Sequence, residues 1–436
     1  MRVFVKSFGC SANLADGEAL AGCLAEAECE LVDSIAAADV IVYNTCAVKG
    51  PTENRVIEAL KRVPADKKLI VAGCLPLINS KRLRREVRFN GIVGPASGDK
   101  IVDVVRRVLN GERVVALQGA VKAKPNLNIP RLRLNPVIGI VPISYGCLGS
   151  CSYCCVVFAR GRLRSYGIRE IVDKVKDDLS AGVREFWFTS QDTGCYGRDV
   201  DTNLAELLKA VCSVEGDFRI RVGMMTPNTA KNILEDLIQA FRSKRVFKFV
   251  HLPVQSGDDH VLERMRRFYS VDDFKQVVGA FRRSFPEVTV ATDVICGFPG
   301  ETEGAFENTS HLIEEVKPDV VNVSKFFPRP RTAAAGMREE FLPPHEVKRR
   351  SGVTAELARK VASERNKRWV GWTGEVLVDE VGKVSGSWVG RNFAYKPVVV
   401  KTDGSESLLG RIVKTRVVKA FPTYLEAEIV HCEGLS

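Results

Sequence analysis

Four cysteines lie close together in residues 145–155, YGCLGSCSYCC. Three of them, Cys147, Cys151 and Cys154, have the spacing C-x-x-x-C-x-x-C and follow a predicted strand. Segments this short can arch over a small inorganic centre, so the three thiolates are candidate ligands for one. Zinc is an alternative, although a zinc site normally takes four ligands in paired spacings. Buried structural thiols are another alternative. Cys155, the fourth cysteine of the stretch, is not part of this spacing.

A second set of cysteines is spread over the first quarter of the chain. Cys10, Cys46 and Cys74 each follow a predicted strand, in VFVKSFGC, DVIVYNTC and LIVAGC. In a parallel sheet such strand ends lie along one edge, so cysteines that are distant in sequence can converge there. A chance trio of buried thiols is the alternative. The pattern therefore predicts a second ligand set.

The elements that must position the second set lie in residues 1–120. Strands are predicted at 3–8, 39–45 and 68–73, and helices at 13–27, 51–63 and 97–111. This alternation predicts an α/β domain with a doubly wound parallel sheet. Residues 121–136, VKAKPNLNIPRLRLNP, break the pattern and are predicted to be a linker.

The first set belongs to a second run of alternating strands and helices, residues 137–366. Its predicted strands are 137–144, 184–190, 218–225, 247–254, 288–295 and 320–327. Six units are too few for a closed eight-unit barrel, so we expect a partial, open (β/α)6 barrel with a side mouth for a large substrate. Residues 367–436 carry short strands with Gly, Asp and Ser turns, which predict a small antiparallel β-barrel. Barrels of that size often bind RNA, and a plain capping domain is the alternative.

Composition excludes several classes of protein. A chain of 436 residues with 45% hydrophobic content needs no disulfides for its core, and its thirteen cysteines are an odd number. The start shows no secretory signal and no apolar run approaches the roughly 20 residues of a membrane span. We therefore expect a cytoplasmic protein with no membrane partner. The net charge of +11 is spread in clusters such as 81–88 and 159–164, which suits a phosphate-rich partner or a merely solvated face.

The motif around the first set resembles a known family. C-x-x-x-C-x-aromatic-C, with Tyr153 as the aromatic residue, followed by ARGRLRS, is similar to the radical S-adenosylmethionine (SAM) enzymes and their methylthiotransferase branch. In that family the three cysteines bind a [4Fe-4S] cluster whose open iron chelates SAM, and reductive cleavage of SAM yields a 5′-deoxyadenosyl radical. FGC-x-x-N-x-x-D-G-E, NTC-x-V and AGC resemble the family's N-terminal domain, whose cysteines bind an auxiliary [4Fe-4S] cluster involved in sulfur insertion. The C-terminal strands resemble a TRAM domain, which binds RNA.

The resemblance also implies further site residues. The SAM pocket would be lined by Tyr153, Gln191, Asp192, Gln255, Ser256 and Asp293. Gly297, Pro299 and Gly300 would shape a close turn, while Asn13, Asp16 and Asn44 would order the ligand loops or simply cap turns. Capping is also the alternative for Asp192. The other cysteines, Cys23, Cys29, Cys212, Cys296 and Cys432, fit core packing better, whereas Cys195 lies in a loop after a strand. No histidine has a pattern that assigns it a catalytic role.

The reaction follows from the bond that must be attacked. An adenine C2–H has no useful acidity near neutral pH, so general base catalysis cannot activate it and a radical is needed. The family's known substrates are threonylcarbamoyl-adenosine and isopentenyl-adenosine at tRNA position 37, in the anticodon loop, and an aspartate of a ribosomal protein. SQDTGCYGRD at 190–199 is most similar to the threonylcarbamoyl-adenosine subgroup. We expect Arg198 or an arginine of 160–164 to meet the threonyl carboxylate.

The same resemblance implies partners besides tRNA. The enzyme would need an electron donor such as a ferredoxin or flavodoxin, and a source of sulfur. Two readings without catalysis remain open: an iron–sulfur electron carrier, which needs no SAM pocket, and an RNA-binding protein with an inactive barrel.

Overall fold

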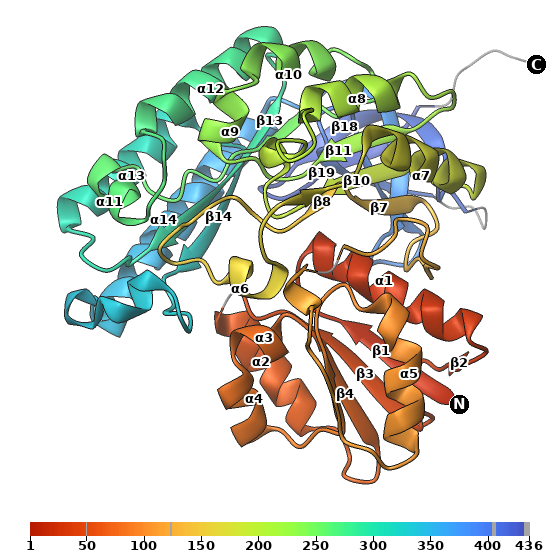
Figure 1. Ribbon diagram of the computed structural model, residues 1–436. Coiled ribbons are helices and arrows are strands. Elements are labelled where there is room, and N and C mark those ends of the chain that lie inside the picture. Colours follow the sequence, from red (N-terminus) through yellow and green to blue (C-terminus); the bar gives the residue numbers. More distant parts are fainter. Residues whose placement is uncertain (49, 123, 403–406, 431–436) are drawn as a thin grey trace, which may run out of the picture.

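The computed structural model describes residues 1–48, 50–122, 124–402 and 407–430. Figure 1 shows an N-terminal α/β domain at the bottom, a curved layer of strands and helices above it, and a small β-barrel behind the upper part. The α/β fold class and the order of its three parts are those predicted from the sequence. In the described part of the chain, no helix combines the length and the apolar character that crossing a membrane requires.

The N-terminal domain is built on one sheet with all strands parallel. In spatial order its strands are β2 (Glu30–Leu31), β1 (Arg2–Ser7), β3 (Val40–Thr45), β4 (Lys68–Gly73), β5 (Gly91–Val93) and β6 (Val114–Ala116). The core on one face includes α1 (Ser11–Glu26) and α5 (Gly98–Leu109), and the core on the other includes α2 (Gly50–Lys61), α3 (Leu75–Ile78) and α4 (Ser80–Glu86). The three predicted strands are the long ones. The other strands have two or three residues, too few to give a hydrophobic pattern.

The central part contains all six predicted strands. They are β7 (Ile138–Pro142), β10 (Glu185–Thr189), β11 (Arg219–Val222), β12 (Phe249–His251), β13 (Thr289–Cys296) and β14 (Val320–Lys325). They form two parallel three-stranded sheets, ordered β11-β10-β7 and β12-β13-β14. Backbone bonds from Ile220 N to Arg245 O and from Phe247 N to Ile220 O join the sheets just before β12. The result is an open barrel with β7 and β14 at its two ends.

Helices cover the outside of the barrel, and α1 of the N-terminal domain packs against its end strand β7. The outer helices include α7 (Ile168–Ser180), α8 (Leu204–Cys212), α10 (Leu234–Phe241), α12 (Val271–Ser284) and α13 (Glu303–Val316). Ala15 of α1 packs against Ile138 and Ile140 of β7, so the N-terminal domain adjoins that end of the barrel. Residues 124–136 of the predicted linker have no helix or strand and pack against the two domains, since Leu132 N donates to Glu18 O and the Tyr166 hydroxyl to Pro125 O.

The C-terminal part is a closed five-stranded barrel, reached through the long helix α14 (Pro344–Lys367). Its strands are β15 (Thr373–Val381), β16 (Ser387–Arg391), β17 (Pro397–Lys401), β18 (Ile412–Ala420) and β19 (Leu425–Ile429). Four neighbouring pairs are antiparallel, as predicted, but β17 and β19 are parallel. An odd number of strands cannot alternate in direction all the way around a closed barrel, so one pair must be parallel.

Two buried acidic residues lie where the small barrel meets the central one. Glu185 of β10 and Asp379 of β15 are both inaccessible to solvent, and Arg391 Nε donates to Asp379 Oδ2 at 2.9 Å. Burial, and then the charge of Asp379, raises the pKa of Glu185 to about 8. Burial also raises the pKa of Asp379. The folded protein therefore favours a proton on this carboxyl pair.

This pair should make stability depend on pH. The pKa of Glu185 is raised on folding, so its contribution is full below its ordinary pKa of 4.5 and is lost as pH rises through about 8. We expect the midpoint of thermal unfolding to fall between pH about 5 and about 9. In Glu185→Gln that fall should be smaller, because glutamine cannot ionise. Equal pH dependence in the two proteins would contradict the raised pKa, and Glu215→Gln, on the barrel surface, is the control.

Candidate active site

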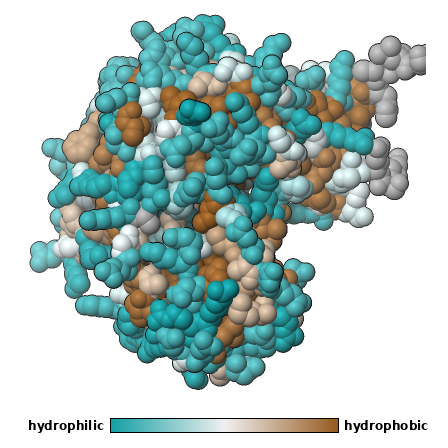
Figure 2. All heavy atoms as spheres, turned by 45° about the vertical axis from the view of Figure 1, so that its right-hand side comes forward, coloured by the Kyte–Doolittle hydropathy of each residue, from teal (hydrophilic) through white to brown (hydrophobic). Residues whose placement is uncertain are grey.

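A large cavity is lined by both the N-terminal domain and the central barrel. Its volume is about 1320 Å³, and all six cysteines of the two sequence sets line it. Single small-molecule sites usually measure about 300–1,000 Å³, so this cavity has room for more than one group. In Figure 2 the surface is mostly hydrophilic, with hydrophobic surface along the junction of the two parts.

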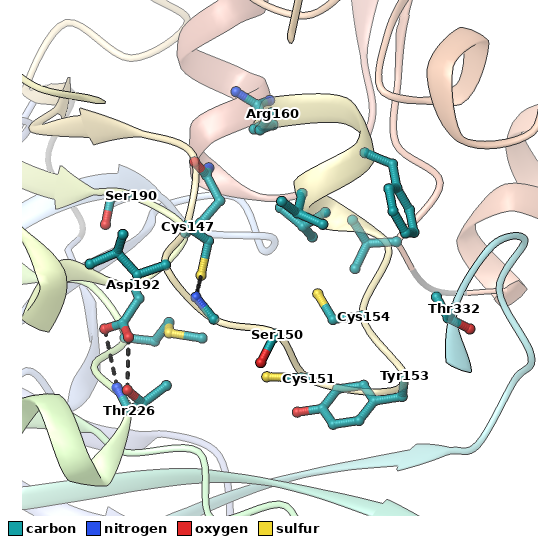
Figure 3. A pocket seen from close by; sticks show the side chains of 18 of the residues that line it. Cys147, Ser150, Cys151, Tyr153, Cys154, Arg160, Ser190, Asp192, Thr226 and Thr332 are labelled. Atoms are coloured by element: carbon teal, nitrogen blue, oxygen red, sulfur yellow. Dashed lines mark hydrogen bonds between the residues drawn. The ribbon is translucent and has the colours of Figure 1, made fainter. Parts of the chain in front are cut away.

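The first cysteine set lies on the loop between β8 (Ser144–Tyr145) and α6 (Val156–Arg160). Figure 3 shows Cys147, Cys151 and Cys154 on this one loop beside the cavity. Gly149 N donates to Cys147 Sγ at 3.2 Å. A Cβ at Gly149 would lie 3.2 Å from that sulfur and 3.7 Å from Cys151 Sγ, so a glycine here leaves the space around both sulfurs open.

Burial disfavours free thiolates on this loop, whereas a neighbouring arginine would stabilise the negative charge of bound ones. Burial raises the pKa of Cys147 to about 11 and also raises the pKa of Cys154, so without a ligand both groups carry protons at neutral pH. Arg267 Nη1 donates to Cys151 Sγ at 3.2 Å. A cationic donor stabilises negative charge on sulfur, which is the charge that an iron–sulfur centre introduces.

The second set lies at one edge of the N-terminal sheet. Cys46 and Cys74 directly follow β3 and β4, and Cys10 lies three residues beyond the end of β1. These strands are neighbours, and Cys74 N donates to Thr45 O at 2.9 Å, which holds two of the strand ends together. A Cβ at Gly9 would lie 2.5 Å from Cys46 Cβ, so only glycine permits this approach. The structure thus brings together the three cysteines that the sequence placed at one edge.

Polar residues of the same edge tie the ligand loops to each other. Asn13 Nδ2 donates to Asn44 O at 3.3 Å, and Asn44 Nδ2 donates to Asn13 O at 2.6 Å. Asp16 instead faces the barrel: it is 2.6 Å from Arg160 Nη2 and accepts a bond from the Tyr145 hydroxyl at 2.9 Å. The asparagines therefore order the N-terminal loops, while Asp16 joins the two halves of the site.

The size of the cavity and its two cysteine trios suit iron–sulfur clusters. The described residues contain no group of three His, Cys, Asp or Glu side chains that could hold a metal ion. The ligands of one zinc ion must converge to within about 2.3 Å of one point. Thiolates on a four-iron cluster bind different irons and need no such convergence. Two cysteine trios in a cavity of about 1320 Å³ therefore suit two [4Fe-4S] clusters, each with one iron not bound by its trio.

Most of the expected SAM-pocket residues line this cavity. Tyr153, Gln191, Asp192, Gln255 and Asp293 are among its lining residues. Ser256 lies behind the wall, since it is 1% exposed and its hydroxyl is 3.4 Å from that of Thr309. The structure therefore gathers five of the six and leaves Ser256 as support for the backbone around Gln255.

Three of these residues have local contacts or a backbone conformation that define their positions. Gln191 Oε1 accepts a bond from Gly146 N at 2.6 Å, on the cysteine loop. Asp192 accepts from Gly194 N at 3.0 Å and from the Thr226 hydroxyl at 2.7 Å, as the capping alternative predicts (Figure 3). Gln255 has a positive φ of 72°, held by the bond from its N–H to Asp293 O. A non-glycine residue in this conformation often marks a functional site.

Some residues of the site gave no usable signal in the sequence. His251 Nε2 lies 2.9 Å from Asp293 Oδ2, although no histidine had been assigned a role. His251 ends β12 and pairs with Ala291 on β13, two residues before Asp293, and only the strand register brings them together. Cys195 donates from Sγ to Asp192 Oδ2 at 3.3 Å and also lines the cavity. Gly297 and Gly300 have positive φ, which agrees with the predicted close turn.

The cysteines expected in the core can be checked where the structure describes them. Cys23, Cys29 and Cys296 are buried and Cys212 is half-buried, as expected for core packing. Cys432 lies outside the described residues.

Arginines dominate the charge of the cavity. Five exposed arginines line it from five separate segments: Arg55, Arg162, Arg198, Arg266 and Arg331. Two carboxylates line it, Asp192 and Asp293, and both are already engaged by neighbouring side chains. The cavity is therefore suited to an anionic substrate.

Comparisons with known proteins agree with this geometry. Residues 141–313 match the Radical SAM superfamily, residues 2–94 match the uncharacterized protein family UPF0004, and residues 367–430 match the TRAM domain. Among solved structures, a radical SAM methyltransferase from Kitasatospora setae, with tryptophan and a SAM analogue bound, has a TM-score of 0.57 at 13% identity. The match covers 76% of this chain and 74% of that one, and at this identity it supports the fold alone.

Relatives that match almost the whole chain are more informative about the family. A probable threonylcarbamoyladenosine tRNA methylthiotransferase from Pyrococcus horikoshii is 40% identical over 99% of this chain and 100% of its own length. The threonylcarbamoyladenosine tRNA methylthiotransferase of Homo sapiens is 35% identical over 98% of this chain and 74% of its own length. Identity at this level over almost the whole chain shows that the protein belongs to the threonylcarbamoyladenosine tRNA methylthiotransferases, a family of radical SAM transferases.

Proposed function

We propose that this chain converts N6-threonylcarbamoyladenosine at tRNA position 37 to its 2-methylthio derivative, with a separate task for each cysteine set. The observation that carries this proposal is that both sets line one cavity. A reaction that must activate a C–H bond and also insert sulfur needs both functions within reach of one bound nucleoside.

The first cysteine set would hold the cluster that binds SAM. Cys147, Cys151 and Cys154 supply three ligands and leave one iron for the cofactor. When bound, the cluster and SAM supply the radical chemistry that an adenine C2–H requires. Tyr153, Gln191, Asp192, Gln255 and Asp293 would position SAM, with Ser256 supporting the loop from behind.

The second set, Cys10, Cys46 and Cys74, would hold the auxiliary cluster linked to sulfur insertion. Asp16 of α1, the helix that follows Cys10, forms a buried ion pair with Arg160 of α6, the helix that follows the first set. Such a contact would help to hold the two sets in position, which matters because small displacements of reacting groups reduce rates strongly.

An arginine would recognise the threonyl carboxylate. Arg160 is 3% exposed and paired with Asp16, so it is a poor candidate. Arg162 and Arg198 are exposed and line the cavity, and in the described chain Arg198 has no ion-pair partner. We assign the carboxylate to Arg198, and Arg162 is the second candidate.

The partners follow from the chemistry. The C-terminal barrel exposes Lys414, Arg416 and Lys419 along β18, which suits contact with the phosphates of tRNA. Reductive cleavage consumes an electron, which a ferredoxin or flavodoxin would supply. The product gains a sulfur, which a separate donor must replace, and a methyl group, which a second SAM molecule would supply. A reducing cytoplasm, where tRNA is found, would suit this reaction.

The function can be tested by product analysis. Anaerobically reconstituted protein is incubated with SAM, a reductant and tRNA bearing threonylcarbamoyl-adenosine, and the nucleosides are analysed by mass spectrometry. We expect a methylthio mass gain on that nucleoside and none on isopentenyl-adenosine tRNA incubated in parallel. Formation of 5′-deoxyadenosine without either product would contradict the substrate assignment and make the ribosomal protein the next substrate to test.

The two cysteine sets should fail differently. Cys151→Ala should abolish SAM cleavage, because the SAM-binding cluster loses a ligand. Cys46→Ala should still release 5′-deoxyadenosine but form no methylthio product. Each variant should bind about half of the iron of the parent protein. Cys155→Ala, a buried cysteine outside both sets, is the control, and identical defects in the first two variants would refute separate tasks.

Carboxylate recognition by Arg198 should appear in the kinetics. We expect Arg198→Ala to lower kcat/KM on threonylcarbamoyl-adenosine tRNA by about 10- to 100-fold, the usual value of a charge-assisted hydrogen bond. Arg198→Lys should restore part of the loss. Arg169→Ala, whose side chain is 96% exposed on α7, is the control. Full turnover by the Arg162→Ala, Arg198→Ala double variant would exclude both residues.

A further inference from the structure

A short segment after α11 (Asp259–Arg264) contributes four consecutive residues to the cavity lining, Arg266, Arg267, Phe268 and Tyr269, of which one cation and one aromatic ring are exposed. Met265, Arg267 and Tyr269 point inward and are buried, whereas Arg266 and Phe268 are exposed. Phe268 is 73% exposed, and both outward residues line the cavity. A phenylalanine this exposed buries little of its own surface in the fold, so packing does not explain its presence.

The inward residues fix the position of the outward ones. Arg267 donates from Nε to the Tyr269 hydroxyl at 2.9 Å and from Nη2 to Pro253 O at 3.3 Å. The Tyr269 hydroxyl lies 2.9 Å from Pro253 O and 2.8 Å from Val254 O. Met265 O accepts a bond from Ser152 N, on the cysteine loop. Phe268 is thus carried by a segment bonded on both sides, so a contact with it would cost little ordering entropy.

The backbone at Arg266 adds an independent observation. Arg266 N donates to Glu263 O and Arg267 N to Leu262 O, which is the Schellman ending of a helix. The residue at this point has a φ of +55°, a conformation that normally selects glycine. An arginine is strained here. Such strain is common at functional sites, and this side chain lines the cavity without an ion-pair partner among the described residues.

An adjacent cation and aromatic ring match single-stranded RNA. Sites for unpaired nucleotides combine basic side chains, which meet phosphates, with aromatic rings on which bases stack. Five exposed arginines line this cavity, and its two carboxylates are already engaged. If the target adenosine enters the cavity, its unpaired neighbours in the anticodon loop remain near the entrance.

From these observations we infer that Phe268 is a stacking platform for an anticodon-loop base next to the target nucleoside, and that Arg266 binds the adjoining phosphate. The inference rests on the proposed tRNA substrate and adds a specificity-determining contact to it. An exposed apolar residue alone would carry no such meaning, since Leu134 is 74% exposed and does not line the cavity.

The test is binding and turnover of an anticodon stem-loop RNA that carries threonylcarbamoyl-adenosine. We expect Phe268→Ala to weaken binding and raise KM by about 5- to 100-fold, the range for loss of one stacked base, with a much smaller effect on kcat. Phe268→Trp should restore binding, because any aromatic face can stack. Leu134→Ala, with matched exposure, should behave as the parent protein. Cluster absorbance checks that each variant is assembled.

A second pair of measurements separates the outcomes. Arg266→Gly should relieve the backbone strain and raise the unfolding temperature, yet weaken RNA binding and reduce the slope of log affinity against log salt by about one. Parent-level binding by Phe268→Ala, or no rescue by tryptophan, would overturn the inference while leaving the tRNA activity of the parent protein intact. A parent protein that neither binds nor modifies the RNA would overturn the proposed function as well.

Discussion

Two buried ion pairs between the N-terminal domain and the barrel hold the site together. Arg160 lies 2.6 Å from Asp16, and Arg329 pairs with Glu53, with all four side chains at most 3% exposed. Removing one partner of such a pair leaves an uncompensated buried charge and typically costs about 3–5 kcal/mol. Each pair joins one residue of the N-terminal domain to one of the barrel. The relative position of the two domains is therefore fixed by charge neutralisation as well as by apolar contact.

This docking creates the cavity. Neither domain encloses it alone, because one supplies Cys10, Cys46 and Cys74 from a sheet edge and the other supplies the cysteine loop. The Asp16–Arg160 pair lies close to both ligand sets, and Tyr145, which directly precedes the loop, also donates to Asp16. A change in the docking would move one set of sulfurs relative to the other. The contacts that stabilise the interface thus also set the positions of the two cysteine sets relative to each other.

The C-terminal barrel is attached by a similar rule at a different place. Asp319, which is fully buried, accepts from Lys396 at 2.9 Å and from Arg365 at 3.2 Å, so helix α14 and the small barrel share one anion of the central barrel. At a second place, Asp379 of the small barrel, paired with Arg391, lies close enough to Glu185 of the central barrel to raise its pKa. The basic strand β18 is in this way joined through buried charge to the central barrel that lines the cavity.

Local pattern determined much of this protein. The strands that precede the cysteines of the N-terminal set and the six barrel strands follow from hydrophobic periodicity, because burial of one face is a property of each segment by itself. Short strands with turn residues likewise predicted a small C-terminal β-barrel, although not its number of strands or its one parallel pair. Spacing likewise predicted Cys147, Cys151 and Cys154 as one ligand set, and the structure places all three on one loop beside the cavity. Tertiary structure alone decided that both sets face one cavity, that His251 meets Asp293, and that Ser256 lies behind the wall. These depend on strand register and on which domain surfaces dock, and no local signal in the chain encodes which distant partner will neutralise a given buried charge.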